Sequence, residues 1–449
     1  MQNFFSDRWK IGFLLLTFCV SFGYALLYRI PPSVDARLFH ETAMQIATHS
    51  RYCVSCDTVP PDRDPAMDNV GPGYQFFLSA IYRTFGVHLW IVWLIQALMH
   101  TIVVAWLWTL LKKILPSDGH RWHFFLPLSL YAFHPDLVQQ TAMLMSEALF
   151  VFLMMASVRL LVYLIEKKDV AKSIHWITVI GLGLILGALF MVRPPGLLIL
   201  LLSVAFLIWR RLSKQAVLII LIAVALQVPW NVRNVQVYHH FVLNAPVGGR
   251  DFWVGLHPES GGEFNVPAEV TKKLEGLDAA ARERVSLEET KKSVLNHPGY
   301  ALKRTVHKAF KLFALSKTSG FWFHYRSTLD HALTVVGSIL FNFVLWSMAF
   351  AQLWEIVRTR RVRHWLVLFS CLGIIALAIA PTLTVVINRY RIPMLPFATL
   401  LAVEWLMFVR GKDRWKSLLG AWAILIIATI SDVWGNKEKV LEHLQRIGR

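Results

Sequence analysis

The chain has 449 residues, of which 56% are hydrophobic and only 16% are charged. A soluble domain usually carries about 25% charged residues, so this composition excludes an ordinary soluble protein and indicates one embedded in lipid. The net charge of +18 would suit a nucleic-acid-binding protein. Most of that charge falls in short clusters between apolar runs, however, and no nucleic-acid-binding motif accompanies it. We therefore expect membrane lipids as partners and no nucleic acid.

Apolar runs long enough to cross a bilayer recur along the whole chain; a span needs about 20 residues. The first run, Ile11–Tyr28, follows a short basic start and has no small-residue cleavage site, which predicts a retained span and not a signal peptide. We expect an all-α polytopic membrane protein with about eleven spans, and residues 1–449 as a single transmembrane domain. The other predicted spans are Leu89–Leu111, Trp122–Val138, Thr141–Ile165, Ile174–Val192, Gly196–Trp209, Gln215–Pro229, Asp330–Val357, His364–Val386, Met394–Val409 and Ser417–Trp434.

Basic clusters occur at every second boundary between these runs. By the positive-inside rule they face the cytoplasm, together with the N-terminus. The two long polar segments, Arg29–His88 and Asn231–Leu329, then both lie on the opposite side. We expect a multi-pass protein of the cell (inner) membrane with two extracytoplasmic loops. The clusters are Lys112/Lys113/Arg121, Lys167/Lys168/Lys172, Arg210/Arg211/Lys214, Arg358–Arg363 and Arg410–Lys416.

The first long loop contains two candidate interfacial helices. In Ala36–Ala47 the apolar residues share one face and the polar residues share the other. Ser33 is the expected N-cap of this helix, which puts Asp35 in its first turn. The second helix, Gly73–Phe85, is apolar on nearly all sides and is expected to lie against the membrane or the bundle.

Between these helices lie two cysteines and a run of aspartates. Cys53 and Cys56 share the loop, and a local disulfide suits an extracytoplasmic position. Asp62, Asp64 and Asp68 are the candidate ligands for a divalent metal, but such a run is more often a solvated loop. We therefore predict no metal and no cofactor.

The second long loop is also expected to carry helices. Ser286 and Glu289 have the spacing of a capping box, which predicts a helix start. The helix Pro298–Leu315 is amphipathic and basic, and two interpretations stay open for it. It is either a helix in the lipid headgroup layer, where it attracts phosphates, or a surface helix with solvated lysines.

Several local strings, taken in order, resemble the GT-C-fold glycosyltransferases that use polyprenyl-phosphate sugars, the group that contains protein O-mannosyltransferases and the lipid A aminoarabinose transferase. The likeness extends over nearly the whole chain, and it depends on the order and spacing of the strings. They are Asp35-x3-Phe39, Gly71-Pro-Gly-Tyr-Gln-Phe-Phe-Leu78, His134-Pro135, Met145-Ser-Glu147, Val192-Arg193-Pro194, Pro229-Trp-Asn-Val-Arg-Asn234, Gly255-Leu-His-Pro258 and Arg389-Tyr-Arg-Ile-Pro393.

This resemblance implies a GT-C-type bundle, a donor sugar on a polyprenyl phosphate (undecaprenyl or dolichyl) and an acceptor that approaches from the extracytoplasmic side. The acceptor would be a lipid, a glycan or a protein. The resemblance also implies that an acidic residue of the first outer loop activates the acceptor, and Asp35 matches that position. Many members have Asp-Glu there, whereas this chain has Asp-Ala, so a second acid is absent from the motif.

Transfer from a lipid phosphate requires a base for an acceptor hydroxyl and cations for the leaving phosphate. Arginine suits the phosphate because its planar fork binds two oxygens at once. We expect Asp35 to be the base; without the family resemblance, the favoured interpretation would be a first-turn residue that complements the helix dipole. The candidate phosphate-binding cations, all on the outer side of the predicted topology, are Arg63, Arg233, Arg250, Arg389 and Arg391.

Two interpretations are open for each of three further residues. Tyr74 and Glu147 complete the candidate substrate-binding set. Tyr74 also suits simple packing, and Glu147, near the end of a span, also suits an ion pair with a nearby arginine. Arg193, before Pro194, either lines the site or marks a helix break.

Two other functions remain as alternatives to a lipid-phosphate glycosyltransferase. One is a transporter or flippase of lipid-linked sugars, although the sequence lacks the internal repeat common in such folds. The other is an O-antigen-ligase-like enzyme that acts on diphosphate-linked lipids. An aspartate at the start of the first outer loop distinguishes the glycosyltransferase from a ligase site built mainly from arginine and histidine.

Overall fold

The computed structural model describes residues 7–60, 64, 66, 71–115, 121–166, 172–246, 248–316 and 326–435, and these residues form helices and no strand. The prediction of an all-α membrane protein is confirmed. Nine helical segments of the described chain are long and apolar enough to cross a bilayer. They are α1 (Asp7–Tyr28), α4 (Leu89–Ile114), α7 (Ser146–Glu166), α8 (Lys172–Val192), α10 (Ser213–Tyr238), α15 (Thr328–Thr359), α16 (Trp365–Leu383), η5 (Asn388–Met394) with α17 (Leu395–Phe408), and α18 (Gly411–Gly435).

The other two predicted spans take different forms. The run Trp122–Val138 is divided into α5 (Arg121–Ala132) and α6 (Pro135–Ala142), because Pro135 lacks an N–H and favours an extended conformation at the preceding residue. The run Gly196–Trp209 is a single apolar helix, α9, of 14 residues. At 1.5 Å per residue it measures about 21 Å, less than the roughly 30 Å of a bilayer core.

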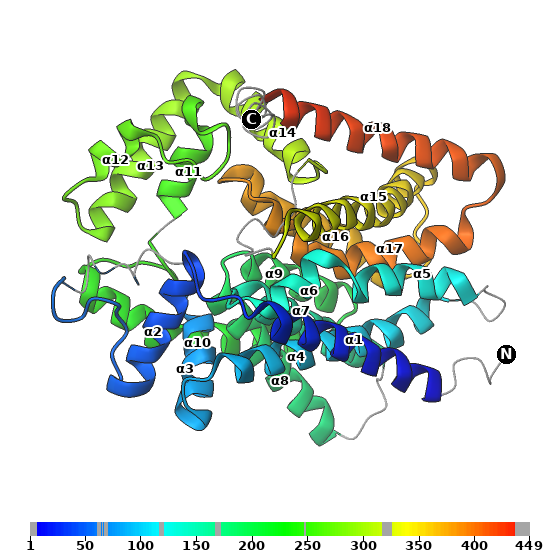
Figure 1. Cartoon of the computed structure of the whole chain (residues 1–449), viewed down its shortest axis with the longest axis horizontal. Helices are drawn as coiled ribbons and strands as arrows, with labels where there is room; N and C mark the ends of the chain where they lie inside the picture. The colour runs from blue at the N-terminus through cyan, green and yellow to red at the C-terminus, as the bar shows by residue number, and fades with distance from the viewer. Residues whose placement is uncertain are drawn as a thin grey trace.

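The centre of the bundle is α17, in which every residue from Leu395 to Met407 is buried. It packs against α4, α5, α15 and α16. The short helix η5 leads directly into α17, so the chain enters the core immediately after the Arg389-Tyr-Arg string. In Figure 1 the long helices run roughly from left to right, and most of the short helices of the two long loops gather at the left: Asp35–His49, Gly73–Phe85, Gly248–Leu256, Ala268–Leu274 and Ala279–Asn296. We call that side the loop end.

The first long loop forms the two helices expected of it, α2 (Asp35–His49) and α3 (Gly73–Phe85), which pack together. Asp35 opens α2, as predicted, but Ser33 is not the N-cap. Val34 occupies that position and provides no side-chain hydrogen bond, while the Ser33 carbonyl accepts from Ala36 N–H at 3.0 Å.

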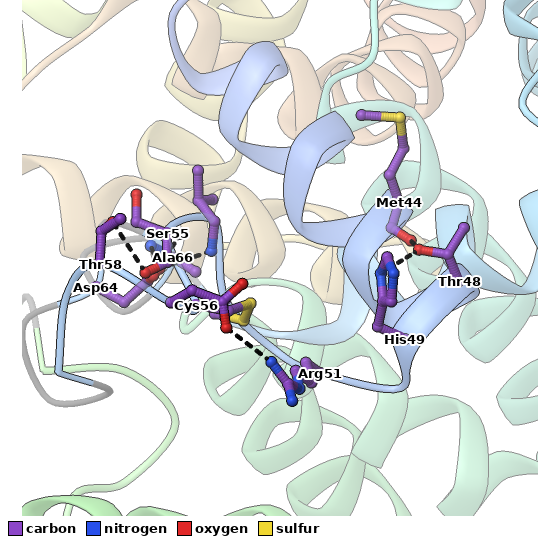
Figure 2. Close-up of a disulfide and its surroundings, with 12 residues drawn as sticks. Met44, Thr48, His49, Arg51, Ser55, Cys56, Thr58, Asp64 and Ala66 are labelled. Carbon is purple, nitrogen blue, oxygen red and sulfur yellow. Dashed lines mark hydrogen bonds and ion pairs between the residues drawn. A yellow bond between two sulfur atoms is a disulfide. The ribbon is translucent and has the colours of Figure 1, made fainter.

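The polar part of this loop is tied together locally (Figure 2). Cys53 and Cys56 form a disulfide, with their Cα atoms 5.3 Å apart. The buried Asp64 carboxylate accepts from three backbone N–H groups, those of Val54, Ser55 and Ala66, at 2.7–2.9 Å. The Asp64 carboxylate therefore fixes the backbone between the two cysteines.

The second long loop contains α11 (Gly248–Leu256), η4 (Pro258–Ser260), α12 (Ala268–Leu274), α13 (Ala279–Asn296) and α14 (Pro298–Leu312). The predicted capping box is wrong, because α13 begins at Ala279, about two turns before Ser286. Asp278 caps it by accepting from Ala281 N–H at 2.7 Å.

Helix α14 has its predicted position in the chain but not the predicted orientation. Lys308 and Lys311 are buried, whereas Leu302 is 67% exposed. The Lys308 ammonium donates to the carbonyls of Leu383 and Thr384, and Lys311 pairs with Asp432 on α18 at 3.2 Å. Neither of the two open interpretations anticipated that these lysines hold the loop to the spans.

Candidate active site

Two glycines bring the long loops close to the bundle. A Cβ on Gly73 would lie 2.8 Å from Val192 N, and a Cβ on Gly255 would lie 1.7 Å from Thr384 O. Only glycine allows backbones to approach this closely. The first loop is therefore held at the residue before Arg193, and the second at the segment that leads into Arg389.

Asp35 and Arg389 meet at this loop end. The Arg389 Nη2 donates to Asp35 Oδ2 at 2.5 Å, across 354 residues of chain. The Arg389 side chain is only 8% exposed, whereas that of Asp35 is 35% exposed. The carboxylate can therefore be reached from outside, while the guanidinium lies behind it.

Glu147 and Arg193 continue the same line of charges inward. Glu147, fully buried at the start of α7, has its Oε1 2.6 Å from Arg193 Nη1 and 3.5 Å from Arg389 Nε. Arg193 lies in the Pro-Pro turn between α8 and α9. The four side chains form an alternating series, Asp35–Arg389–Glu147–Arg193, which we call the site chain. Its charges balance, which is what keeps buried charges tolerable.

Tyr390 packs against the site chain, and Tyr74 lies within electrostatic reach of it. The guanidinium of Arg193 lies 5.1 Å from the centre of the Tyr390 ring, and that of Arg389 lies 5.9 Å from it. The hydroxyl of the buried Tyr74 donates to Gln96 at 2.8 Å. Burial raises the pKa of Tyr74, with smaller contributions from Tyr82 and Glu147. Tyr74 therefore lies within the electrostatic reach of Glu147, but its own contacts are those of a packing residue.

The remaining predicted arginines are not brought to Asp35 by the contacts observed. Arg233 stacks on Tyr52 and Trp230, with its guanidinium 5.4 and 4.8 Å from their ring centres. The buried Arg391 faces Asp136 at 3.7 Å and donates to the Ala314 carbonyl. Arg250 is half-buried beside Asp251. Arg63 lies outside the described residues.

Two acids close to these groups were not selected from the sequence. Asp136, at the start of α6, is the partner of Arg391, and its only sequence signal was its place in a helix start after a proline. Asp251 lies on α11, and burial raises its pKa to about 6; Arg250 opposes this shift, and the charge of Asp35 adds to it. Its only signal was a Gly-Gly-Arg-Asp string in a loop predicted to face the same side as Asp35.

The described residues contain no group of three or more His, Cys, Asp or Glu side chains able to hold a metal ion. Of the aspartate run, Asp62 and Asp68 lie outside the described residues. Asp64 is occupied by backbone N–H groups, as described above.

An apolar groove of about 580 Å³ lies between α8, α9 and α10. Phe190 and Leu197 line it, and they flank the turn that carries Arg193. The wall opposite comes from the last turns of α10, including Val232 and Val235. The groove therefore offers a hydrocarbon-like surface close in sequence to an arginine of the site chain.

No protein-family model matches the sequence, and no curated protein matches it. Among solved structures, the chain is similar to the oligosaccharyltransferase of Archaeoglobus fulgidus tethered to an acceptor peptide containing the NVT sequon, with a TM-score of 0.53 and 14% identity. The alignment covers 96% of this chain and 56% of that one, so this chain spans little more than half the length of the oligosaccharyltransferase.

The chain is also similar to ArnT from Cupriavidus metallidurans, solved with undecaprenyl phosphate and in the apo state. The identities are 13% and 15%, and the TM-scores are 0.41 and 0.39. The alignments cover 90% and 88% of this chain, and 78% of ArnT in both cases. At such identities structural likeness speaks for the fold alone, and that fold is of the GT-C type.

Proposed function

We propose that this protein is a membrane glycosyltransferase that moves a sugar from a polyprenyl-phosphate carrier to an acceptor on the extracytoplasmic side. The observation that carries the proposal is the site chain. An accessible carboxylate, Asp35, is in contact with a buried arginine, Arg389, at the end of the bundle where both long loops lie. This pairs a base with a phosphate-binding cation, the two groups that the reaction needs.

The donor phosphate would be bound by the guanidinium of Arg389. In the structure this guanidinium is shared between Asp35 and Glu147. A phosphate diester that replaces Asp35 on Arg389 leaves the carboxylate free to act as a base. Glu147 keeps the guanidinium in place during the exchange, and Arg193 neutralises Glu147 from its other side.

The proposed transfer balances in bonds, protons and charge. Asp35 takes the proton of the acceptor hydroxyl, the acceptor oxygen forms a bond to the anomeric carbon, and the bond from that carbon to the phosphate oxygen breaks. The leaving lipid phosphate gains one negative charge, which Arg389 stabilises. The groove between α8, α9 and α10 supports this proposal, because a prenyl chain needs apolar surface next to its phosphate site.

The site faces the extracytoplasmic side in this proposal. Support comes from the basic clusters of the sequence, which all lie at the ends of spans opposite to the two long loops. The acceptor is a lipid, glycan or protein present on that side.

The test uses purified full-length protein and a panel of polyprenyl-phosphate sugars. At least one donor should protect the protein from thermal unfolding, and the same donor should yield a transferred sugar with a suitable acceptor. Asp35→Asn should still bind that donor but lose about 10²- to 10⁴-fold in turnover, the usual contribution of a general base. Asp57→Asn is the matched control, because Asp57 is an exposed aspartate of the same loop.

Near-normal turnover of Asp35→Asn would remove Asp35 from the mechanism. A protein that binds none of the panel would contradict the proposed donor class. A protein that moves the lipid across a vesicle membrane with the sugar–phosphate bond intact would be a transporter.

A further inference from the structure

Helix α11 is fixed against the segment that leads to Arg389. Gly255 on α11 approaches the Thr384 carbonyl too closely for any side chain. The same carbonyl accepts from the Lys308 ammonium at 2.6 Å. Two residues later, Val386 N–H donates to the Gly262 carbonyl at 2.9 Å. The second long loop therefore cannot shift relative to η5 without breaking these contacts.

Asp251 lies on the face of α11 that points toward this segment. It precedes Gly255 by four residues, and residues four apart share one face of a helix. Its side chain is only 18% exposed. Arg250 Nε lies 3.5 Å from Asp251 Oδ1, and within the described residues this oxygen is buried without a hydrogen bond. Asp251 is thus a largely buried carboxyl group within electrostatic reach of Asp35 and Tyr390, and one of its oxygens carries no hydrogen bond.

Two carboxyl groups from other helices, Glu283 on α13 and Asp35 on α2, lie within electrostatic reach of Asp251. Burial raises the pKa of Glu283 on α13, and the charge of Asp251 adds to that shift. Both oxygens of Glu283 accept from Gly249 N–H, at 2.9 and 3.0 Å, which favours its ionised form. The titratable or charged residues near Asp251 are Arg250 on α11, Glu283 on α13, Lys308 on α14, Asp35 on α2 and Tyr390 on η5.

We propose that Asp251 is a donor-binding residue that carries a proton whenever the anionic phosphate of the donor is bound, so that donor binding takes up one proton. The proposal rests on the proposed function. In the site chain, Arg193 and Arg389 are already balanced by Glu147 and Asp35. An ionised Asp251 would therefore repel an incoming phosphate, whereas a neutral carboxyl group donates its O–H to a phosphate oxygen.

The coupling between proton uptake and donor binding predicts the direction in which donor affinity changes with pH. The pKa of Asp251 in the free protein is about 6, and a bound phosphate raises it further. Donor affinity is then constant below about pH 6 and falls as the pH rises above it, by up to about tenfold per pH unit until the pKa of the bound state is reached.

The experiment measures the dissociation constant of a synthetic polyprenyl-phosphate sugar from pH 5 to pH 8. This donor is a phosphate diester, which keeps a single negative charge throughout that range, so any pH dependence comes from the protein. We expect wild-type affinity to weaken about tenfold or more from pH 5.5 to pH 7.5. Asp251→Asn, an uncharged mimic of the protonated acid, should bind tightly over the whole range. Glu288→Gln, the same change at an exposed position of α13, should behave like wild type.

Proton uptake provides a measurement that needs no variant. Binding enthalpies determined at pH 7 in buffers of different ionisation enthalpy should give an uptake approaching one proton per donor. Binding without uptake, or an Asp251→Asn variant that keeps the wild-type pH dependence, overturns the role of Asp251 and leaves the proposed function standing. A wild-type protein that binds no polyprenyl-phosphate sugar at any pH overturns the proposed function and this proposal together.

Discussion

Arg389 and Arg391 lie two residues apart in η5, yet they belong to different regions of the molecule. Arg389 contacts Asp35, whose side chain is 35% exposed. Arg391 contacts Asp136, and both of these side chains are only 1% exposed. Asp136 also accepts from Ser338 Oγ at 2.5 Å and from Asn342 Nδ2 at 3.2 Å, which joins α6 to α15.

The carboxylate partners of the two arginines differ in accessibility to solvent and substrate. In the Asp136 cluster, hydrogen bonds from neighbouring elements occupy the carboxylate, and water and substrate do not reach it. In the site chain the outermost carboxylate meets solvent, and in the proposed function a phosphate exchanges with it on Arg389. We therefore propose that Arg389 binds the donor and that Arg391 has a structural role, although the sequence made them equal candidates.

Among the variants that test this comparison, we expect Arg389→Met to have the largest effect on turnover. Loss of the cation should reduce turnover by about 10²- to 10³-fold, because a charge-stabilising donor to the leaving phosphate is removed. The protein should still fold, because Glu147 keeps Arg193 and Asp35 reaches solvent. Transfer assays and thermal unfolding of the same preparation check this. Full activity in a folded variant would exclude Arg389 from the site.

Arg391→Met should have the opposite profile. It leaves the buried Asp136 without its cation, and loss of one partner of a buried ion pair costs about 3–5 kcal/mol of unfolding free energy. Denaturant unfolding of the membrane-extracted protein measures this loss, and turnover per folded molecule should stay close to wild type. A stable Arg391→Met protein with weakened donor affinity would reverse our assignment.

Gly255→Ala should have a smaller effect, because it pushes α11 away from Thr384 without removing a charge. We expect a loss of about 1–3 kcal/mol, as for other overpacked positions, and a weaker pH dependence of donor binding because Asp251 moves with the helix. Gly299→Ala is the control, because a Cβ there would meet nothing within 4 Å. Equal stability of the two variants would show that the second loop is not held at Thr384.

The last expected effect concerns Lys308 and the pH dependence of stability. Burial lowers its pKa to about 7 from the ordinary 10.5. Between about pH 7 and 10.5 the unfolded chain binds the extra proton, so this residue makes stability rise with pH over that window. Lys308→Met should remove this rise, whereas Lys303→Met, at an exposed position of the same helix, should keep it. Unfolding temperatures measured across the window distinguish the two outcomes.

The prediction of about eleven spans illustrates the limit of local sequence patterns. Hydropathy located every apolar run, but it could not tell that the run around Pro135 divides into two helices or that the run Gly196–Trp209 forms a helix of only 14 residues. The basic helix α14 illustrates a second limit. Its pattern was correct, but which face turns inward depends on the carbonyls and carboxylates that neighbouring segments present to Lys308 and Lys311.

The sequence by itself predicted the membrane environment, the helical class and the helix that Asp35 opens, because hydropathy and helical periodicity act over a few residues. Charge bias likewise predicted that the two long loops lie on one side. Only the tertiary structure decided which arginine meets Asp35, and that Glu147 and Arg193 continue this line of charges. Ion pairs between residues hundreds of positions apart depend on how η5, α7 and the two loops pack, and glycines at close backbone contacts set that packing. No local sequence pattern encodes how these elements pack.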